Sequence, residues 1–197
     1  MATIFWDVDT QVDFMDPTGK LYVPGAEAIV PKLAQLTRWA GQQGILVVAS
    51  ACAHLPGDKE FEQYPPHCLA GTPGQKKIPE TLLVPSALVP NELTELDGPY
   101  NYAQVVIEKQ QFDVFSNPNM DSFLPLLGNV DVVLYGVVTE FCVAAAARGL
   151  LRRGYKVSVV TDAIRYFDLA QGQAALDELQ RLGARLITSD EILRQAA

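Results

Sequence analysis

The sequence predicts an α/β protein with three layers (α/β/α), in which helices cover both faces of a six-stranded, mostly parallel sheet. Short apolar runs of strand length alternate along the chain with longer amphipathic runs of helix length. Of the 197 residues, 49% are hydrophobic, which is enough for a large buried core. No internal repeat or low-complexity segment interrupts the alternation, so we expect a single domain over residues 1–197.

The first half of the chain gives two strands, one helix and a long irregular segment. Thr3–Val8 is an apolar run that predicts the first strand. Apolar residues recur at three- and four-residue spacing over 26–43, which predicts a helix that ends at Gly44. Ile45–Ala49 predicts the second strand. Residues 51–100 are rich in proline and show no long periodicity, so we expect a loop region that carries function.

The alternation resumes after residue 100. We expect strands at 104–108, 130–138, 156–160 and 185–187, and helices at 140–153, at 169–182 and from residue 190. In an open parallel sheet, ligands bind beyond the carboxyl ends of the strands. The residues that follow each strand are therefore the candidates for a functional site.

Charge and cysteine content narrow the classes of partner. The formal net charge is −8, from 15 Lys+Arg and 23 Asp+Glu, so no basic surface is expected for nucleic acid or for an anionic membrane. The first residues do not have the pattern of a signal peptide, and no apolar run has the length of a membrane span. The three cysteines, Cys52, Cys68 and Cys142, form no C-x-x-C pair, which favours a reducing compartment and predicts a cytoplasmic protein.

Candidate catalytic residues follow three of the predicted strands. Asp9 follows the first strand, Lys109 follows strand 104–108, and Cys142 comes shortly after strand 130–138. A carboxylate can take the proton of a thiol, and a nearby ammonium stabilises the anion that results. These residues are therefore a candidate base, electrostatic partner and nucleophile.

The position of Cys142 at the predicted start of a helix supports this interpretation, because the positive end of the helix dipole favours the thiolate. The backbone N–H groups of Val138 and Cys142 are the candidate donors to an oxyanion. Taken singly, Asp9, Lys109 and Cys142 have structural explanations as a turn residue, a surface charge and a buried apolar cysteine. Their convergence on one sheet edge favours catalysis.

The segment CAHLPGDKEFEQYPPHC holds both histidines of the chain, His54 and His67. It also contains Cys52, Asp58 and Glu60, and histidine, carboxylate and thiolate are all ligands of transition metals. The spacing matches no tight ligand motif. Two alternatives stay open from the residues alone, a partial metal site and a polar surface loop.

Four segments stand in order along the chain: DVDTQVDF, YPPHCLAGTPGQ, EKQQFDVF and GVVTEFCV. In this order and at these separations they resemble the isochorismatase-like cysteine hydrolases, and among them the nicotinamidase branch. The resemblance implies a six-stranded parallel sheet, with Cys142 as nucleophile, Asp9 as general base and Lys109 as the residue that orients and stabilises. It also implies a cis peptide between Val137 and Val138, with the N–H groups of Val138 and Cys142 forming the oxyanion hole.

The resemblance further implies a divalent metal beside these residues, held by an Asp-x-His pair, a second histidine and the histidine of a W-P-P-H-C motif. His54 and His67 match two of these histidines, whereas Cys52 stands at the aspartate position and Asp58 and Glu60 stand where the remaining histidine is expected. Two alternatives follow: zinc or another divalent ion held by His54 and His67 with these substitutes, or a site without metal.

In either case, the resemblance places Phe14 and Tyr64 as aromatic walls of the substrate pocket, with Tyr64 at the position of the motif's tryptophan.

The function expected from the residues and the resemblance together is hydrolysis of a small amide, in which Cys142 attacks the carbonyl and forms a thioester. The alternatives are vinyl-ether hydrolysis of isochorismate, which does not need the cysteine, and a non-catalytic member of the fold. The expected partners are a small-molecule amide and further copies of the chain, as a homo-oligomer.

Overall fold

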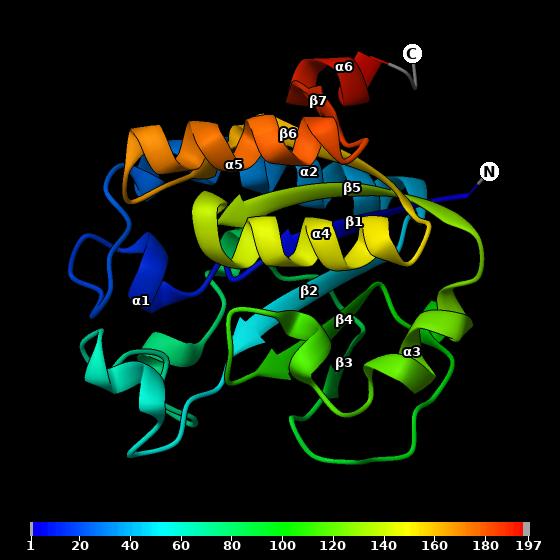
Figure 1. Ribbon diagram of the computed structural model, residues 1–197. Helices are drawn as coiled ribbons and strands as arrows, with labels where there is room; N and C mark the ends of the chain where they lie inside the picture. Colours follow the sequence, from blue (N-terminus) through cyan, green and yellow to red (C-terminus); the bar gives the residue numbers. More distant parts are fainter. Residues whose placement is uncertain (1, 195–197) are drawn as a thin grey trace.

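The computed structural model describes residues 2–194. They form three layers, a parallel sheet between two layers of helices (Figure 1). In the described residues the sheet has seven strands in the order β3-β4-β2-β1-β5-β6-β7, and every neighbouring pair is parallel. The strands are β1 (Ala2–Val8), β2 (Val47–Cys52), β3 (Ser86–Val89), β4 (Gln104–Lys109), β5 (Val130–Val137), β6 (Lys156–Arg165) and β7 (Arg185–Ile187). The predicted fold class is confirmed.

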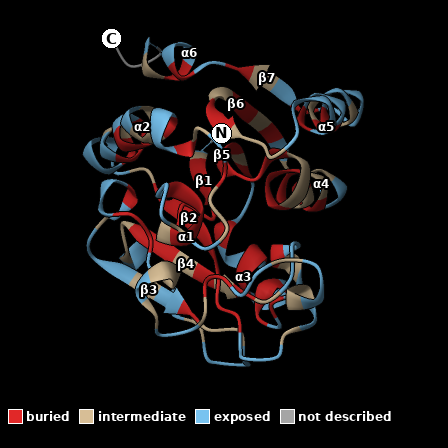
Figure 2. Cartoon of the chain, turned by 90° about the vertical axis from the view of Figure 1, so that its left-hand side faces the viewer, coloured by how far each residue is buried: buried red, intermediate tan, exposed pale blue. Residues whose placement is uncertain are grey.

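Helices cover both faces of this sheet. They are α1 (Val12–Met15), α2 (Val30–Gln43), α3 (Met120–Leu127), α4 (Ala144–Arg152), α5 (Leu169–Arg181) and α6 (Ser189–Leu193). Figure 2 shows α2 on one side of the sheet and α4 and α5 on the other, with buried residues concentrated between the layers. None of the helices in residues 2–194 is both long and apolar enough to cross a membrane.

The alternation of side chains along β1 explains why both faces are covered. Ile4, Trp6 and Val8 belong to the core shared with α3, α4 and α5, whereas Phe5 belongs to the core shared with α2. Successive side chains of a strand point to opposite faces, so a strand that is apolar at nearly every position must be buried on both. All four side chains are at most 1% exposed.

The predicted strand count is wrong, because the sheet has seven strands where six were expected. The additional strand, β3, has four residues and lies at the sheet edge inside the segment predicted as loop. Helix α3 was also not predicted, and it contains Pro125, a residue that normally signals the end of a helix. A strand of four residues is too short, and a helix with an internal proline too irregular, to show the periodicity on which the prediction relied.

The helix predicted over 140–153 also differs in its first turn. Strand β5 ends at Val137, a π-helical turn covers Thr139–Val143, and the α-helix α4 begins only at Ala144. Cys142 therefore lies in an irregular turn between strand and helix. Such single π turns are frequent at functional sites.

The strand order brings the carboxyl ends of four strands together at one edge of the sheet. After β4 on one side of β1, the chain crosses to β5 on the other side, so the carboxyl ends of β1, β2, β4 and β5 lie next to this change of direction. Ligands of open parallel sheets bind at such a point. Asp9, Cys52, Lys109 and Cys142 lie at or just beyond these strand ends.

Candidate active site

Asp9 lies immediately after β1, in a left-handed backbone conformation with φ of 51°. Its side chain is 1% exposed, and its two carboxylate oxygens have separate partners. Oδ1 accepts a hydrogen bond of 2.6 Å from the Ser50 hydroxyl, and Oδ2 lies 2.8 Å from Nζ of Lys109. The strand end therefore holds a buried carboxylate whose charge is compensated by a lysine.

Lys109 is the last residue of β4 and is also 1% exposed. Its Nζ atom lies 3.1 Å from Sγ of Cys52 and 3.4 Å from Sγ of Cys142, in addition to the contact with Asp9. Burial by itself lowers the pKa of Lys109, but the Asp9 carboxylate and the neighbouring sulfurs of Cys142 and Cys52 together more than offset this and raise the pKa well above its usual value. Lys109 is therefore a fixed positive charge at the centre of the four residues Asp9, Cys52, Lys109 and Cys142, here called the Lys109 cluster.

Cys142 is 5% exposed and projects from the π turn into the Lys109 cluster. The dipole argument predicts a lowered pKa, whereas interaction with the Cys52 thiol and burial raise the pKa of Cys142 well above its usual value. A raised pKa favours the thiol, so nucleophilic chemistry at this residue would require a neighbouring base to take its proton. The peptide between Val137 and Val138 is cis, as the resemblance implies.

A small cavity of about 20 Å³ opens on the Lys109 cluster. Both predicted pocket residues, Phe14 and Tyr64, line it, and so do the proposed oxyanion residues Val138 and Cys142. Further walls that the sequence did not indicate come from Leu21, Phe112, Phe141 and Phe167. Two of them, Phe112 and Phe141, lie in the quoted segments EKQQFDVF and GVVTEFCV, and these segments were the available signal.

Three of the aromatic residues that line this cavity with Cys142 also pack against one another. The ring centroids of Phe112 and Phe141 are 5.1 Å apart, and the Tyr64 ring lies 6.2 Å from each of them. Phe112 is 37% exposed, which places this group at the surface of the protein. The aromatic group therefore forms the part of the cavity lining that reaches the surface.

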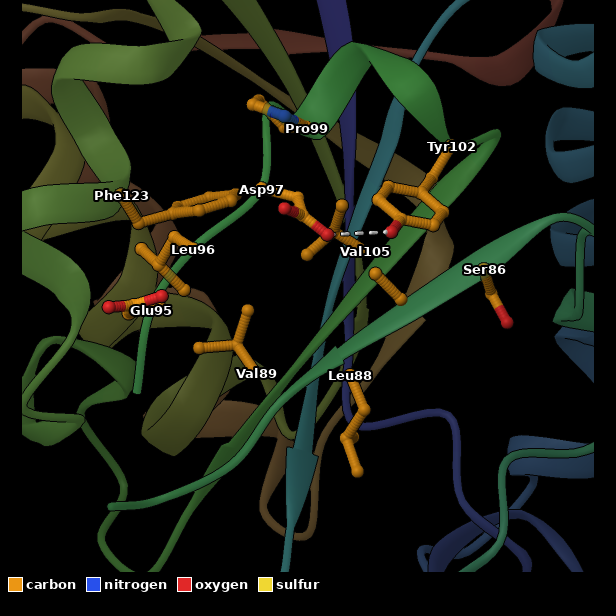
Figure 3. A pocket seen from close by; sticks show the side chains of 11 residues that line it. Ser86, Leu88, Val89, Glu95, Leu96, Asp97, Pro99, Tyr102, Val105 and Phe123 are labelled. Carbon is orange, nitrogen blue, oxygen red and sulfur yellow. Dashed lines mark hydrogen bonds between the residues drawn. The ribbon is translucent and has the colours of Figure 1, made fainter. Parts of the chain in front are cut away.

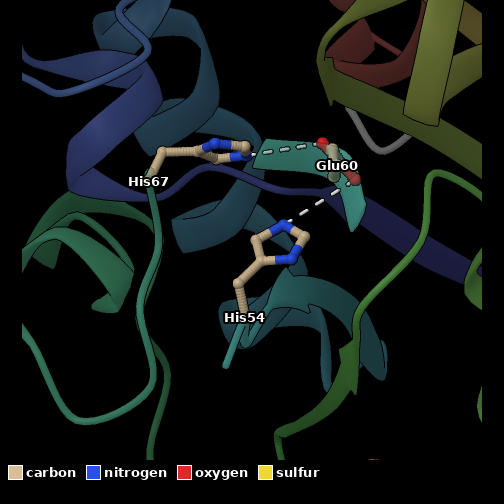
Figure 4. Close-up of side chains that lie close together, drawn as sticks. All are labelled: His54, Glu60 and His67. Carbon is tan, nitrogen blue, oxygen red and sulfur yellow. Dashed lines mark ion pairs between the residues drawn. The ribbon is translucent and has the colours of Figure 1, made fainter. Parts of the chain in front are cut away.

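His54, Glu60 and His67 form a second group beside this cavity, here called the histidine cluster (Figure 4). Glu60 Oε2 lies 3.9 Å from His54 Nε2, and Glu60 Oε1 lies 3.5 Å from His67 Nε2. One donor atom from each of the three residues lies within 4.8 Å of the others. Figure 4 shows both imidazoles directed at the same carboxylate.

The histidine cluster has the properties of a metal site. The Nδ1 atoms of His54 and His67 are bonded to Asp58 Oδ2 and to the Pro65 carbonyl, each at 2.9 Å, and this leaves Nε2 free to act as a ligand. Within residues 2–194, neither buried Nε2 atom has a hydrogen-bond partner. Burial lowers the pKa of His67 and so favours the neutral form that binds metals. Two imidazoles and a carboxylate fit zinc.

Only three of the five residues predicted as metal ligands lie in the histidine cluster. His54, Glu60 and His67 come together, Asp58 is hydrogen-bonded to Nδ1 of His54, and the sulfur of Cys52 lies against Lys109. Sequence spacing did not distinguish the three clustered residues from the other two.

Gln11 fixes the backbone of the Lys109 cluster, a role that the sequence analysis missed. Its side-chain oxygen accepts from the Cys52 N–H at 2.7 Å, and its Nε2 donates to the Cys52 carbonyl at 2.8 Å and to the Gln75 carbonyl at 2.6 Å. Asp13 acts similarly on the loop, since its Oδ2 accepts from the Cys68 N–H at 2.6 Å. The quoted segment DVDTQVDF contains both residues, so the motif itself was the available signal.

A larger cavity of about 240 Å³ lies elsewhere, between β3, β4 and the segment 95–99 (Figure 3). Figure 3 shows apolar side chains together with Ser86, Glu95 and Asp97, and the Tyr102 hydroxyl donates a hydrogen bond of 3.2 Å to Asp97. The residues that line this cavity include no cysteine or histidine. Its lining in residues 2–194 includes Ser86, Glu95 and Asp97 but no cationic side chain beside them, whereas the smaller cavity combines the carboxylates of Asp9 and Glu60 with the thiols of Cys52 and Cys142. The smaller cavity therefore remains the candidate active site.

The fold defined by these elements is that of the isochorismatase-like hydrolases. A structure of an isochorismatase-like hydrolase from Alkaliphilus metalliredigens covers all of both chains with a TM-score of 0.79 and 25% identity. Residues 3–191 match the family described as the isochorismatase domain, and the chain therefore belongs to this family. The family membership expected from the four motifs is confirmed.

Several relatives are named for nicotinamide or pyrazinamide. A pyrazinamidase of Pyrococcus horikoshii, solved in complex with zinc, has 27% identity and a TM-score of 0.76 over 95% of this chain and 99% of that chain. A nicotinamidase/pyrazinamidase of Mycobacterium tuberculosis is 29% identical over 92% of this chain and 96% of that protein. A relative from Arabidopsis thaliana, 26% identical over 93% of this chain and 91% of that protein, is named a probable inactive nicotinamidase. Matches to some other relatives span less than half of those proteins.

Proposed function

We propose that this protein is a cysteine hydrolase that cleaves the C–N bond of a small amide. The single observation that carries the proposal is the position of the Lys109 ammonium, which contacts the Asp9 carboxylate at 2.8 Å and the Cys142 sulfur at 3.4 Å. A base, a cation and a thiol at these distances are the groups that thiol activation requires. The nicotinamidase and pyrazinamidase relatives support an amide as the substrate class.

In the proposed reaction Asp9 takes the proton of Cys142, and the sulfur attacks the amide carbon while Lys109 compensates the charge. The N–H groups of Val138 and Cys142 donate to the oxyanion that forms. Asp9 returns the proton to the leaving nitrogen, so that ammonia or an amine departs and a thioester remains. Asp9 then takes a proton from water, whose oxygen forms a C–O bond with the thioester carbon. The C–S bond breaks, the acid is released, and Asp9 returns the proton to the Cys142 sulfur.

We further propose that the histidine cluster binds a divalent metal, with zinc favoured by its two imidazoles. His54, Glu60 and His67 would hold the ion, and Glu60 also lines the cavity that opens on Cys142. A metal there supplies a Lewis acid to which a polar atom of the substrate can bind. In this proposal, Cys142, Asp9 and Lys109 still carry out the reaction at the amide carbon.

The cavity constrains the substrate. Its lining in the described part of the chain includes the carboxylates of Asp9 and Glu60 but no arginine and no exposed lysine, which disfavours an amide that carries a carboxylate. Its volume of about 20 Å³ is smaller than the roughly 150 Å³ that accommodates a benzene ring. A ring such as that of nicotinamide therefore requires movement of the aromatic walls, most easily the exposed Phe112.

We expect the 197 residues to act as one cytoplasmic domain that associates with copies of itself. Exposed apolar side chains near β3 support association, with Val84 86% exposed, Leu88 59% and Leu82 49%. A sedimentation mass equal to a single chain would contradict it.

The proposed activity is tested by ammonia release from nicotinamide, pyrazinamide and a panel of small neutral amides. The wild-type protein should release ammonia, and Cys142→Ala should reduce kcat by at least about 10³-fold, because the nucleophile is lost. Cys68→Ala is the matched control, since Cys68 is equally buried but does not line the cavity. It should keep wild-type turnover.

The same assay separates the alternatives. Ammonia release that survives in Cys142→Ala would argue against the thiol as nucleophile, and cleavage of isochorismate by the wild-type protein and by Cys142→Ala, measured in parallel, would favour vinyl-ether hydrolysis. The absence of any turnover in the wild-type protein, with and without added zinc, would favour a non-catalytic member of the fold, a class that the name of the Arabidopsis relative represents.

A further inference from the structure

Cys52 is a second thiol in the Lys109 cluster, and the proposed hydrolysis leaves it without a role. Its sulfur lies 3.1 Å from Lys109 Nζ and 3.8 Å from Asp9 Oδ2. The Cys142 sulfur lies 3.4 Å from the same Nζ atom. One ammonium thus contacts two buried thiols, which come from β2 and from the turn after β5.

The position of Cys52 is fixed by its backbone. Gln11 accepts from its N–H at 2.7 Å and donates to its carbonyl at 2.8 Å, and Ser50, two residues earlier on β2, is bonded to Asp9. The side chain is 3% exposed. Cys52 is therefore held toward the nucleophile.

Both sulfurs are accessible from the same space. Cys52 and Cys142 line the cavity of about 20 Å³, which has room for one water-sized molecule. Hydrogen peroxide is only slightly larger than water, so it fits where an aromatic ring does not. The ammonium beside both sulfurs stabilises a thiolate once Asp9 has taken a proton, and the thiolate is the form that peroxides oxidise.

We propose that Cys142 and Cys52 form a reversible disulfide when the protein encounters hydrogen peroxide. The Cys142 thiolate attacks one peroxide oxygen, so that an S–O bond forms, the O–O bond breaks and the other oxygen leaves as water after taking a proton. The sulfenic acid on Cys142 is then attacked by the sulfur of Cys52. The S–S bond forms, the S–O bond breaks, and the hydroxide leaves as water with the proton of the Cys52 thiol. The two thiols supply the two electrons that reduce the peroxide.

The disulfide has two consequences. It occupies the sulfur that would attack an amide, so hydrolysis stops until a dithiol reduces the bond. It also removes the sulfenic acid before further oxidation to the irreversible sulfinic acid. Cys52 would thus act as the resolving thiol for Cys142.

Cys68 provides an internal comparison. It is buried, its sulfur lies 3.8 Å from the Gly74 carbonyl, and it does not line the cavity. Burial raises the pKa of its thiol, and no ammonium contact stabilises its anion among the contacts of the described chain. Of the three disulfides that three cysteines allow, the proposal therefore requires the one between Cys52 and Cys142.

The test uses the full chain with its thiols reduced, treated with an equimolar amount of hydrogen peroxide, alkylated and digested for mass spectrometry. The expected product is a Cys52–Cys142 cross-linked peptide that is lost on treatment with dithiothreitol. Cys68→Ala should give the same cross-link. In Cys52→Ser, Cys142 should instead be trapped by dimedone or reach the sulfinic acid, and dithiothreitol should not restore it from the latter.

Three results would overturn the proposal. They are a cross-link that involves Cys68, a wild-type protein in which Cys142 becomes sulfinic acid while Cys52 stays a free thiol, and resistance of both thiols to peroxide. The wild-type cross-link does not depend on how well the Cys52→Ser variant folds. It also does not depend on amide hydrolysis, so a protein without turnover would refute the proposed function and leave this test intact.

Discussion

The Lys109 ammonium compensates a buried carboxylate and lies against two thiols, so its removal affects folding and chemistry differently. We predict that Lys109→Met lowers kcat for the amide by about 10²–10³-fold, comparable to the loss of one electrostatic contact in a transition state. It should also cost about 3–5 kcal/mol of unfolding free energy, because Asp9 would stay buried without its partner. Steady-state kinetics and urea denaturation measure the two effects.

Lys77 offers the matched control at the same scale. Its Nζ lies 2.6 Å from Asp7 Oδ2, and both side chains are buried, but neither lines the cavity on Cys142. Lys77→Met should lose similar stability while the folded protein keeps its kcat. If Lys109→Met retained the same kcat as Lys77→Met, the role assigned to Lys109 would be wrong.

At the scale of elements, the close approach of β5 to β1 beneath the Lys109 cluster depends on Gly136. Its φ is 117°, and a Cβ atom there would lie 2.1 Å from the Val8 carbonyl oxygen. We predict that Gly136→Ala costs several kcal/mol, because the left-handed conformation adds about 1–2 kcal/mol and the clash about 1–3 kcal/mol more. Urea denaturation gives the value.

Gly128→Ala is the control that measures the cost of the backbone conformation without a clash. Gly128 also has a positive φ, 68°, but nothing lies within 4 Å of the position of its Cβ. This variant should lose only the conformational part. Equal losses in both variants would show that the β1–β5 approach tolerates a methyl group.

The elements also show how far the sequence could predict the site. Asp9, Lys109 and Cys142 were predictable because hydrophobic periodicity locates the ends of buried strands, and parallel strands bring those ends together. The loop of residues 51–100 was not predictable in this way, because it is positioned by single contacts between distant residues. The bonds from Gln11 to Cys52 and from Asp13 to Cys68 are examples, and neither leaves a periodic pattern.

At the scale of the whole molecule, a metal in the histidine cluster would link the irregular loop to the sheet. His54 lies just after β2, whereas Glu60 and His67 lie further along the loop, so one ion would join segments that the hydrophobic core leaves largely at the surface. Because the ligands come together only in the folded chain, binding is coupled to folding. The stability of the entire domain should therefore report on the metal.

We predict that zinc at about 100 times its dissociation constant adds about 2.7 kcal/mol to the unfolding free energy. For a chain of this length the corresponding rise in Tm is about 5–10 °C, measured by calorimetry of metal-free protein with and without zinc. His67→Ala should abolish the rise, whereas Cys142→Ala should keep it, since its sulfur belongs to the Lys109 cluster and not to the histidine cluster. A rise of equal size in His67→Ala would place zinc elsewhere, and no rise in the wild-type protein would mean that the paired imidazoles do not hold the ion. In the hydrolysis assay, by contrast, Cys142→Ala should lose turnover although it still binds zinc. The two measurements together would then separate the residues that bind the metal from the residue that reacts.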